Sequence, residues 1–274
     1  PSPSSILVAR SNDPEASPFR GQTITHATVR ASPESKADGG GVPVVAMDGV
    51  YFTWPGRPRF SLSIDRFAVD AGDRLLLLGP SGGGKSTLLS LLAGIVKPQR
   101  GSIGILGTDI TKLSGPARDR FRAEHFGIIF QMFNLLPYGT VIDNVLLPLS
   151  FSNSRRANVE AASSPAKEAT RLLTHLGLSP DEVASHRASS LSVGQQQRVA
   201  AARALIGGPE LIIADEPTSS LDRGHQREFL DLLFGDIANS GATLIMVSHD
   251  ETLAENFTHV VRLEDFAQME RGAR

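Results

Sequence analysis

Short apolar runs recur along the chain, and segments long enough for a helix separate them. Runs of this kind are typical of strands in the middle of a parallel sheet, where both faces are covered. Because strands and helices alternate in this pattern, it predicts a doubly wound α/β fold. The runs lie at 74–78, 126–130, 211–214 and 243–247.

A long helical stretch interrupts the alternation. From 140 to about 205 the pattern is mainly helical, with leucines clustered at 172–178 and a second helix over 195–206. We therefore expect an inserted helical subdomain over about 132–205, within a folded domain that covers 44–274. Further helices are expected from near Lys85, over 115–124 and over 223–238.

Strand-like stretches also lie ahead of the first helix and just after it. The stretches 44–53 and 60–69 meet across a turn-forming cluster at 54–58, and 101–107 follows as another strand. The first 43 residues differ in composition, because 1–43 is rich in Ser, Pro, Ala and Gly and sustains no periodicity. We expect a disordered tail there, with a docking peptide or a weak targeting sequence as the alternative.

Composition narrows the class of protein. The 274 residues are 41% hydrophobic, and 27 basic residues against 29 acidic ones give a net charge of −2, so no global field attracts nucleic acid. The absence of cysteine excludes a disulfide framework and thiol catalysis. No apolar run approaches the roughly 20 residues that span a bilayer, and the N-terminus lacks the features of a signal peptide. We expect a soluble, cytosolic chain with no nucleic-acid partner.

The run GPSGGGKST at 79–87 predicts a phosphate site. It fits the pattern G-x-x-x-x-G-K-[ST] and follows an apolar strand, which is the context that makes such a match specific. Glycines allow the backbone to form a concave nest of N–H groups, and the helix that follows adds its positive end. Lys85 would lie along the β- and γ-phosphates, and the Ser86 hydroxyl would be a ligand of Mg²⁺. The predicted nucleotide-binding residues are Gly79, Pro80, Ser81, Gly82, Gly83, Gly84, Lys85, Ser86 and Thr87.

Two adjacent carboxylates end the apolar strand LIIADEP at 211–217. Successive side chains of a strand point to opposite faces, so Asp215 and Glu216 cannot share one task. We expect Asp215 to hold Mg²⁺ through water. Glu216 would face the γ-phosphate and orient or deprotonate the attacking water.

The run LSVGQQQRVAAARAL at 191–205 predicts a second anion-binding surface. Ser192 and Gly194 precede a long helix, an arrangement that presents free N–H groups and a hydroxyl to an anion. Two such surfaces distant in sequence suggest one nucleotide shared between two subunits. An N-capped amphipathic helix with Ser192 as its cap is the alternative.

From about 44 to 265 the chain resembles the nucleotide-binding subunit of an ABC transporter. The resemblance implies a P-loop NTPase core with an antiparallel β subdomain and an inserted helical subdomain. Val193 departs from the family pattern because it replaces the first glycine of LSGGQ, and we expect reduced backbone freedom rather than lost activity. The motifs are GPSGGGKST for Walker A, Gln131 in IIFQ for the Q-loop, LSVGQ for the signature, LIIADE for Walker B, SSLD for the D-loop and His249 in VSHD for the switch histidine.

The resemblance also implies roles, with ATP and Mg²⁺ as cofactors. Gln131 would reach Mg²⁺ or the water and report the nucleotide state, and His249 would hydrogen-bond the γ-phosphate and hold Glu216. Trp54 falls where the family places an aromatic that stacks on adenine. Ser192, Gly194 and Gln195 would contact the nucleotide of a second copy in a head-to-tail ATP-sandwich dimer.

The family further implies an integral membrane permease as partner, which holds the chain at the cytoplasmic face of the inner membrane. The strings FQMFNLLPYGTVIDNV and HRASSLSVGQQQRVAAARAL look most like the lipoprotein-releasing and macrolide-efflux group (LolD and MacB type), to which FtsE is also similar. An FtsE-like regulatory ATPase and an importer subunit of the amino-acid type remain alternatives, and a small-molecule kinase would leave LSVGQ unexplained. Met132, Phe133, Leu135 and Leu136 form either the groove for a permease helix or ordinary core.

Overall fold

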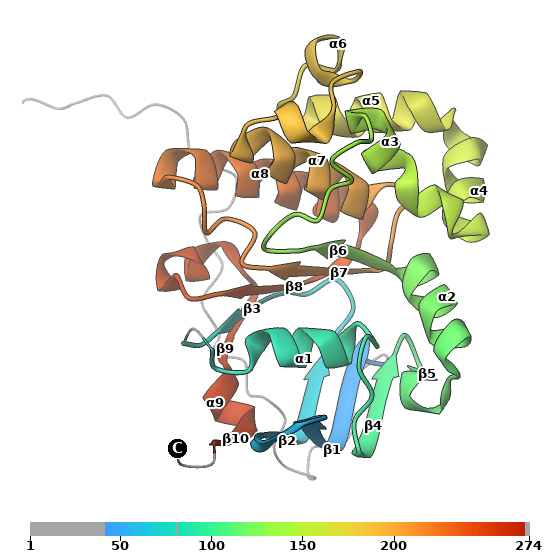
Figure 1. Cartoon of the computed structure of the whole chain (residues 1–274). Coiled ribbons are helices and arrows are strands. Elements are labelled where there is room, and N and C mark those ends of the chain that lie inside the picture. The colour runs from blue at the N-terminus through green and yellow to red at the C-terminus, as the bar shows by residue number, and fades with distance from the viewer. Residues whose placement is uncertain (1–41, 81, 272–274) are drawn as a thin grey trace, which may run out of the picture.

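The computed structural model describes residues 42–80 and 82–271. The tail predicted over 1–43 therefore lies outside the described residues except for its last two positions, and so does Ser81. Figure 1 shows a stack of layers, with an antiparallel sheet at the bottom, α1 above it, then a parallel sheet, and the helices α3 to α8 on top, while α2 lies at the side.

The antiparallel sheet contains the first two strands, joined by the tight turn at Gly56, which has a φ of 73°. Its strand order is β10-β2-β1-β4-β5. Val45 pairs with Val69 and Phe52 with Leu62 across β1 and β2. The strands are β1 (Val45–Trp54), β2 (Arg57–Val69), β4 (Arg100–Ile105), β5 (Thr108–Asp109) and β10 (Ala267–Arg271).

The parallel sheet has the order β6-β7-β8-β3-β9. Every pair of neighbours in it is parallel, as between Leu76 and Met246 or between Ile213 and Ile245. The α/β alternation predicted from the apolar runs is thus confirmed. The strands are β3 (Arg74–Leu78), β6 (Phe126–Ile129), β7 (Leu211–Asp215), β8 (Thr243–Ser248) and β9 (His259–Arg262).

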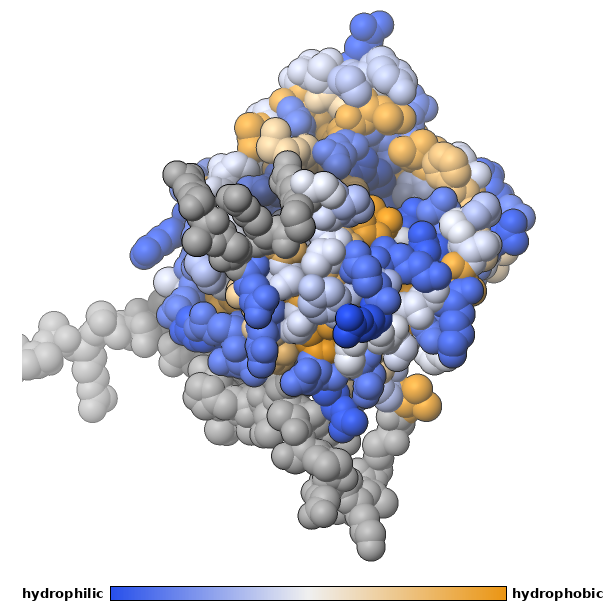
Figure 2. Space-filling view, turned by 60° about the horizontal axis from the view of Figure 1, so that its bottom comes forward, coloured by the Kyte–Doolittle hydropathy of each residue, from blue (hydrophilic) through white to orange (hydrophobic). Residues whose placement is uncertain are grey.

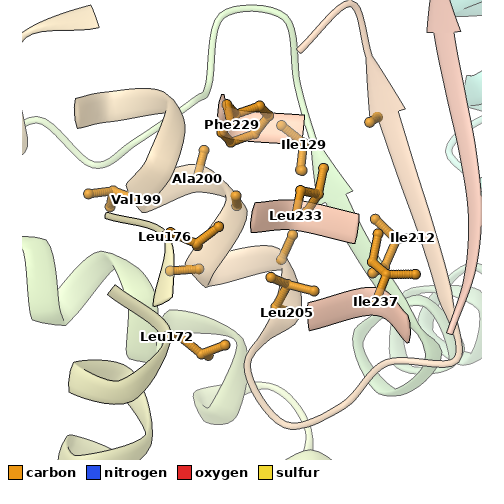
Figure 3. Packing of buried hydrophobic residues seen from close by; sticks show 14 of the residues in the cluster. Ile129, Leu172, Leu176, Val199, Ala200, Leu205, Ile212, Phe229, Leu233 and Ile237 are labelled. Carbon is orange, nitrogen blue, oxygen red and sulfur yellow. The ribbon is translucent and has the colours of Figure 1, made fainter. Parts of the chain in front are cut away.

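The parallel sheet separates two hydrophobic cores, because side chains alternate along each strand. Ile212 and Ala214 face the core beneath the helices, whereas Leu211 and Ile213 face the core shared with the antiparallel sheet. Figure 3 shows the first core, where Ile129 lies beside Phe229 and Leu233 of α8 and Ile212 lies beside Ile237 of the same helix. Both cores are continuous with the strands that carry the site, so the sheet edge is held rigidly from two sides.

The range predicted as a helical subdomain, about 132–205, contains the helices α3 to α7. The predicted helices near Lys85 and over 223–238 correspond to α1 and α8. The α-helices are α1 (Lys85–Leu92), α2 (Gly115–His125), α3 (Val141–Leu146), α4 (Asn153–Ala162), α5 (Pro165–His175), α6 (Pro180–Val183), α7 (Val193–Leu205), α8 (Arg223–Ser240) and α9 (Leu263–Phe266), and the 3-10 helices are η1 (Ile110–Lys112), η2 (Leu147–Ser150), η3 (Ala188–Ser190) and η4 (Glu251–Asn256).

The C-terminal part contains elements that the sequence patterns did not predict. After β8 the chain returns to the edge of the parallel sheet as β9, then crosses to the antiparallel sheet, where β10 pairs with β2. The pairing joins Met269 to Leu62, which are far apart in sequence. The chain thereby ties its last described strand to its first sheet.

Hydrophilic side chains cover most of the face in Figure 2, and the hydrophobic ones there form small separate groups. None of the helices in the described part of the chain combines the length and the apolar content that a bilayer crossing requires.

Candidate functional site

The candidate site lies where the strands of the parallel sheet end. Because β6, β7, β8 and β3 run in one direction, their carboxyl ends meet at one edge, which is the usual ligand edge of an open α/β sheet. The phosphate loop follows β3, Asp215 ends β7, and His249 follows β8 directly. Gln131 comes two residues after β6. Topology alone thus gathers the phosphate loop, Gln131, Asp215 and His249 at one edge of the sheet.

Glycines give the phosphate loop its sharp turns. Gly82 and Gly84 have φ values of 74° and 87°, which residues with a Cβ rarely adopt. A Cβ on Gly83 would lie 2.8 Å from the carbonyl oxygen of Pro80, and one on Gly84 would lie 2.9 Å from Met269 Sδ. Gly84 caps α1 without a side-chain bond, so no capping side chain competes with a ligand for the N–H groups of the first turn. The loop is a cradle that fits a phosphate chain.

The side chain of Lys85 bonds back to the main chain of this loop. Its Nζ donates to the carbonyl oxygens of Gly79 at 2.6 Å and Pro80 at 3.1 Å. The same Nζ lies 3.2 Å from Glu216 Oε1, and both side chains are almost buried. A phosphate that reaches Lys85 must therefore compete with Glu216 for the ammonium group.

Glu216 connects the lysine to the histidine. Its other carboxylate oxygen, Oε2, accepts from His249 Nδ1 at 2.6 Å. The Glu216 side chain is 11% exposed and that of His249 is 59% exposed, so the histidine reaches inward from the open side of the site. Glu216 thus contacts the Lys85 ammonium group through one carboxylate oxygen and the His249 ring N–H through the other.

Asp215 and Glu216 take different positions because the backbone turns at Glu216, and not because side chains alternate along a strand. The strand β7 ends at Asp215, and Glu216 follows with a φ of 46° and donates its N–H to the carbonyl of Val247. Both residues line the same cavity. A left-handed glutamate is a costly conformation that the surroundings must enforce, and such residues cluster at functional sites.

Asp215 pairs with the predicted magnesium ligand Ser86. Ser86 Oγ donates to Asp215 Oδ2 at 3.0 Å. Burial raises the pKa of the Asp215 carboxyl, and the nearby Glu216 carboxylate acts in the same direction, against the hydrogen bond from Ser86 and the attraction of Lys85. Hydroxyl and carboxylate oxygens are ligands that Mg²⁺ accepts when phosphate oxygens and waters complete the octahedron. Within residues 42–80 and 82–271 no group of three or more His, Cys, Asp or Glu could hold a metal by itself.

A cavity of about 520 Å³ unites these residues. Gln131 lines it together with Trp54 from the end of β1. Two lining residues, Phe60 and Ser219, were not assigned to the site in advance. Phe60 is the fourth residue of β2, which begins at Arg57, and an aromatic this close in sequence to Trp54 could have signalled a second aromatic wall. The lining residues are Trp54, Phe60, Gly82, Gly84, Lys85, Ser86, Thr87, Gln131, Asp215, Glu216, Ser219 and His249.

Trp54 is tied to the first turn of α1. Its Nε1 donates to Thr87 Oγ1 at 3.2 Å, and its ring meets Phe52 edge to face with centroids 5.1 Å apart. Both contacts fix the indole at the cavity rim, where its stacking on adenine stays a prediction.

Ser192, Gly194 and Gln195 lie in a different place. They line a separate cleft of about 400 Å³ at the start of α7, together with Leu221 and His225. Ser192 Oγ accepts from the Gln195 N–H at 3.3 Å, and Gln195 Oε1 accepts from the Ser192 N–H at 2.9 Å, which is a capping box. Val193 begins the helix with 48% of its surface exposed. The structure does not bring this group to the nucleotide cavity of its own chain.

Two of the residues after Gln131, for which a docking groove and ordinary core were the alternatives, differ in exposure. Phe133 is 6% exposed and belongs to the hydrophobic core, whereas Met132 is 81% exposed. Phe133 also has a left-handed backbone, with a φ of 57°.

Comparison with known proteins gives consistent results. A family model described as ABC transporter matches residues 62–219. The macrolide export ATP-binding/permease protein MacB of Rhodopirellula baltica is 39% identical over 197 residues, which are 72% of this chain but 28% of that protein. The lipoprotein-releasing system ATP-binding protein LolD of Porphyromonas gingivalis is 38% identical over 198 residues, 72% of this chain and 87% of that protein.

Solved structures agree with these relatives. The ATP-binding cassette MJ0796, described as a dimer in a post-hydrolysis state bound to ADP and Pi, superposes with a TM-score of 0.70 and 31% identity. The match covers 83% of this chain and 98% of that one.

Proposed function

The chain belongs to the ABC transporter family, and from that membership we propose that it binds and hydrolyses ATP to drive a membrane permease. The lipoprotein-release and macrolide-efflux relatives support a role of that type. The observation that carries the proposal is the chain of contacts from Lys85 through Glu216 to His249, in the same cavity as Ser86 and Asp215.

The residues of this cavity divide the work of phosphoryl transfer. The loop N–H groups and Lys85 bind the phosphates and offset their charge. Ser86 and Asp215 would hold Mg²⁺, which when bound supplies positive charge that polarises the phosphate oxygens. Gln131 lines the same cavity and is the third candidate ligand.

Glu216 and His249 act on the attacking water. A phosphate that draws Lys85 to itself releases Glu216 Oε1, so that the carboxylate can orient or deprotonate a water. His249 keeps Oε2 in place through its N–H and would hydrogen-bond the γ-phosphate from the exposed side. The displacement of Glu216 from Lys85 thereby links substrate arrival to activation of the base.

A second copy of the chain completes the site. Ser192, Gly194 and Gln195 lie in a cleft apart from the cavity of their own chain, and the dimeric state named for the MJ0796 cassette supports a head-to-tail pair. In that pair the N-terminal end of α7 would face the γ-phosphate bound by the partner. We propose 44–274 as the ATPase domain and about 132–205 as its helical subdomain.

The membrane partner is part of the proposal. The chain spans under a third of its MacB relatives, whose name includes a permease, but most of the LolD relative, whose name is that of an ATP-binding protein. We propose a separate permease that holds this chain at the cytoplasmic face of the membrane. A permease with a large extracytoplasmic domain in a co-purification would fit the release or efflux type, whereas an importer-type permease would contradict it.

The Glu216→Gln variant tests the function. It removes the charge that activates water but keeps the side chain's shape, so we expect ATP to bind and hydrolysis to fall by about 10²–10³-fold. The variant should then accumulate as a dimer in ATP and Mg²⁺, measured by light scattering after size-exclusion chromatography. The exposed Glu255, changed to Gln, is the control and should behave like wild type. A Glu216→Gln chain that stays monomeric in saturating ATP would contradict the proposal.

A further inference from the structure

The loop that carries Gln131 contains two consecutive left-handed residues without being glycine-rich. Phe133 and Asn134 have φ values of 57° and 49°. This conformation is uncommon for any residue with a side chain and is a genuine outlier for a bulky one such as Phe. Strained backbone of this kind persists only where neighbouring groups hold it.

Gln131 and Met132 are the central residues of the turn that precedes this pair. The turn is closed by the N–H of Phe133, which donates to the carbonyl of Phe130 at 2.9 Å, and the N–H of Asn134 donates to the carbonyl of Met132 at 2.6 Å. The Gln131 side chain lines the nucleotide cavity, whereas Met132 is 81% exposed. One short turn therefore connects the cavity to the outer surface.

Arg203 holds the far end of this turn. It lies near the end of α7 and is 8% exposed. Its Nη1 donates to the carbonyl of Asn134 at 2.7 Å and its Nη2 donates to the carbonyl of Phe133. The two donors of one planar guanidinium thus match two consecutive carbonyls that left-handed backbone presents together, a geometry that the single ammonium group of lysine cannot reproduce.

Burial of the charged Arg203 side chain in this position costs free energy. Burial lowers the pKa of Arg203, because a charge in a poorly solvated place costs free energy unless polar groups surround it. The contacts that offset this cost include the two loop carbonyls. The loop and the helix consequently hold each other: the arginine needs the carbonyls, and the carbonyls keep their orientation through the arginine.

The helix that carries Arg203 begins at the other anion-binding surface. Ser192 caps α7 and the helix runs without interruption from Val193 to Leu205. A continuous helix transmits displacement of one end to the other. The nucleotide cavity and the cleft at Ser192 are therefore connected through α7 and the Arg203 side chain.

We propose that Arg203 is a positioning residue that sets the place of Gln131 in the nucleotide cavity and couples it to the signature end of α7. This inference rests on the proposed function of the cavity. Movement of α7, when Ser192 meets the partner's nucleotide, would reposition the turn and with it Gln131. In the opposite direction, pressure on the exposed Met132 would reach α7 through the same two hydrogen bonds.

Arg155 provides a matched control. It is also a buried arginine of the helical range, 3% exposed, and it also donates to main-chain carbonyls, those of Phe126, Ala204 and Ile206. Burial lowers its pKa to about 10. None of these carbonyls belongs to the loop of Gln131. Replacing either arginine removes a buried guanidinium, but only one replacement frees the loop.

The first experiment needs no nucleotide. Amide hydrogen exchange of the full chain should show faster exchange at residues 131–136 in Arg203→Met and in Arg203→Lys than in wild type. Arg155→Met should leave 131–136 unchanged and accelerate exchange elsewhere. Equal protection of 131–136 in wild type and in both Arg203 variants would overturn the proposal.

The second experiment is a double-mutant cycle with Gln131. Arg203→Met should lower kcat by about tenfold to a hundredfold, while the dissociation constant of ATP, followed by fluorescence of the single tryptophan, Trp54, changes by less than about twofold. The loss of kcat should disappear in a Gln131→Ala background, because a residue that acts through Gln131 has nothing left to position. Independent, multiplicative losses would overturn the proposal, and so would an equal loss in Arg155→Met.

A third variant covers the case in which Arg203→Met does not fold. Asn134→Val acts from the exposed loop end of the same contact, because a β-branched residue disfavours the left-handed backbone that presents the carbonyl to Arg203, so it should reproduce the faster exchange and a smaller loss of kcat. An Asn134→Val chain identical to wild type in both measurements would count against the proposal. If the wild-type chain does not hydrolyse ATP, the proposed function fails, and the exchange measurement still decides whether Arg203 holds the loop.

Discussion

The nucleotide cavity and the signature end of α7 are both polar sites that suit phosphate, but they satisfy their polar groups differently. In the cavity, Lys85, Glu216 and His249 come from three separate elements and pair with one another across the sheet edge. At the start of α7, Ser192 and Gln195 are three residues apart and bond each other. The first site is assembled by the fold, and the second is complete within one helical turn.

The difference supports the proposal that the signature end of α7 acts together with a second subunit. In the cavity the cation contacts Glu216 and the hydroxyl contacts Asp215, so the groups proposed to bind phosphate are already gathered within one chain. A capping box on an exposed helix end is stable without a ligand and has no acid, base or metal ligand of its own. Its N–H groups and hydroxyl become useful only when a phosphate bound by another surface is brought to them.

The largest expected effect concerns the cation of the cavity. Lys85→Met keeps the aliphatic stem but removes the charge that binds phosphate, and it leaves Glu216 with His249 alone. We expect phosphate release from ATP to fall by about 10²–10³-fold and ATP binding, followed by Trp54 fluorescence, to weaken as well. The exposed Lys97, changed to Met, is the control. A rate of phosphate release close to that of wild type in Lys85→Met would contradict the assignment of this cavity as the site that acts on ATP.

A smaller effect is expected at the signature end. Ser192→Ala removes an N-cap, which costs about 1 kcal/mol, and it removes the hydroxyl offered to the partner's nucleotide. We expect hydrolysis to fall by about tenfold, the loss of one charge-assisted hydrogen bond, while the dissociation constant of ATP for the monomer stays constant.

Ser164 offers a matched control for that experiment. It is an exposed N-cap whose Oγ accepts from the N–H of Lys167 at 3.3 Å, the distance also found at Ser192. Ser164→Ala should lose a similar amount of stability and no activity. Equal losses of activity in both variants would mean that Ser192 is only a cap.

The smallest effect is a gain of stability in the cavity. Burial raises the folded-state pKa of Asp215, so the charged carboxylate destabilises the folded chain at pH values above that pKa. The cost is relieved as pH falls through the folded pKa, because the folded state then takes up a proton more readily than the unfolded state. Asp215→Asn, which keeps an acceptor for Ser86, should therefore raise the Tm at pH 7.

Thermal unfolding at several pH values measures this directly. The advantage of Asp215→Asn over wild type should shrink between about pH 5 and pH 4, where carboxyl groups ordinarily titrate. An advantage that grows as the pH falls would have the wrong sign and would refute the explanation by burial.

The sequence predicted the elements whose signals are local. The glycines of the phosphate loop and the apolar runs of β3, β7 and β8 specify strand, turn and helix over a few residues, and the parallel sheet then places Asp215 and His249 near Lys85. Cap residues such as Ser192 and turn residues such as Gly56 are equally local. Each of these could be read without knowledge of any distant partner.

The rest depends on contacts between distant segments. The strand β10 forms because Ala267 and Met269 find Ile64 and Leu62, a pairing that no pattern within 267–271 announces. The pattern predicted that Asp215 and Glu216 differ in position because side chains alternate along a strand. In the structure they differ because Glu216 has a left-handed backbone, whose N–H donates to the carbonyl of Val247. Phe60 joins the cavity through tertiary packing near Gly84, 24 positions later in the chain.

The return of β10 to the first sheet also has a consequence in time. A ribosome releases the chain from its N-terminal end, so the phosphate loop emerges long before the strand that lies against it. Two residues of β10 are among the last described residues to be synthesised. Met269 approaches Gly84 and pairs with Leu62, and Ala267 pairs with Ile64. A nascent chain would therefore carry a recognisable phosphate loop without the support that shapes it, and we expect nucleotide capture to begin only after translation has passed residue 271.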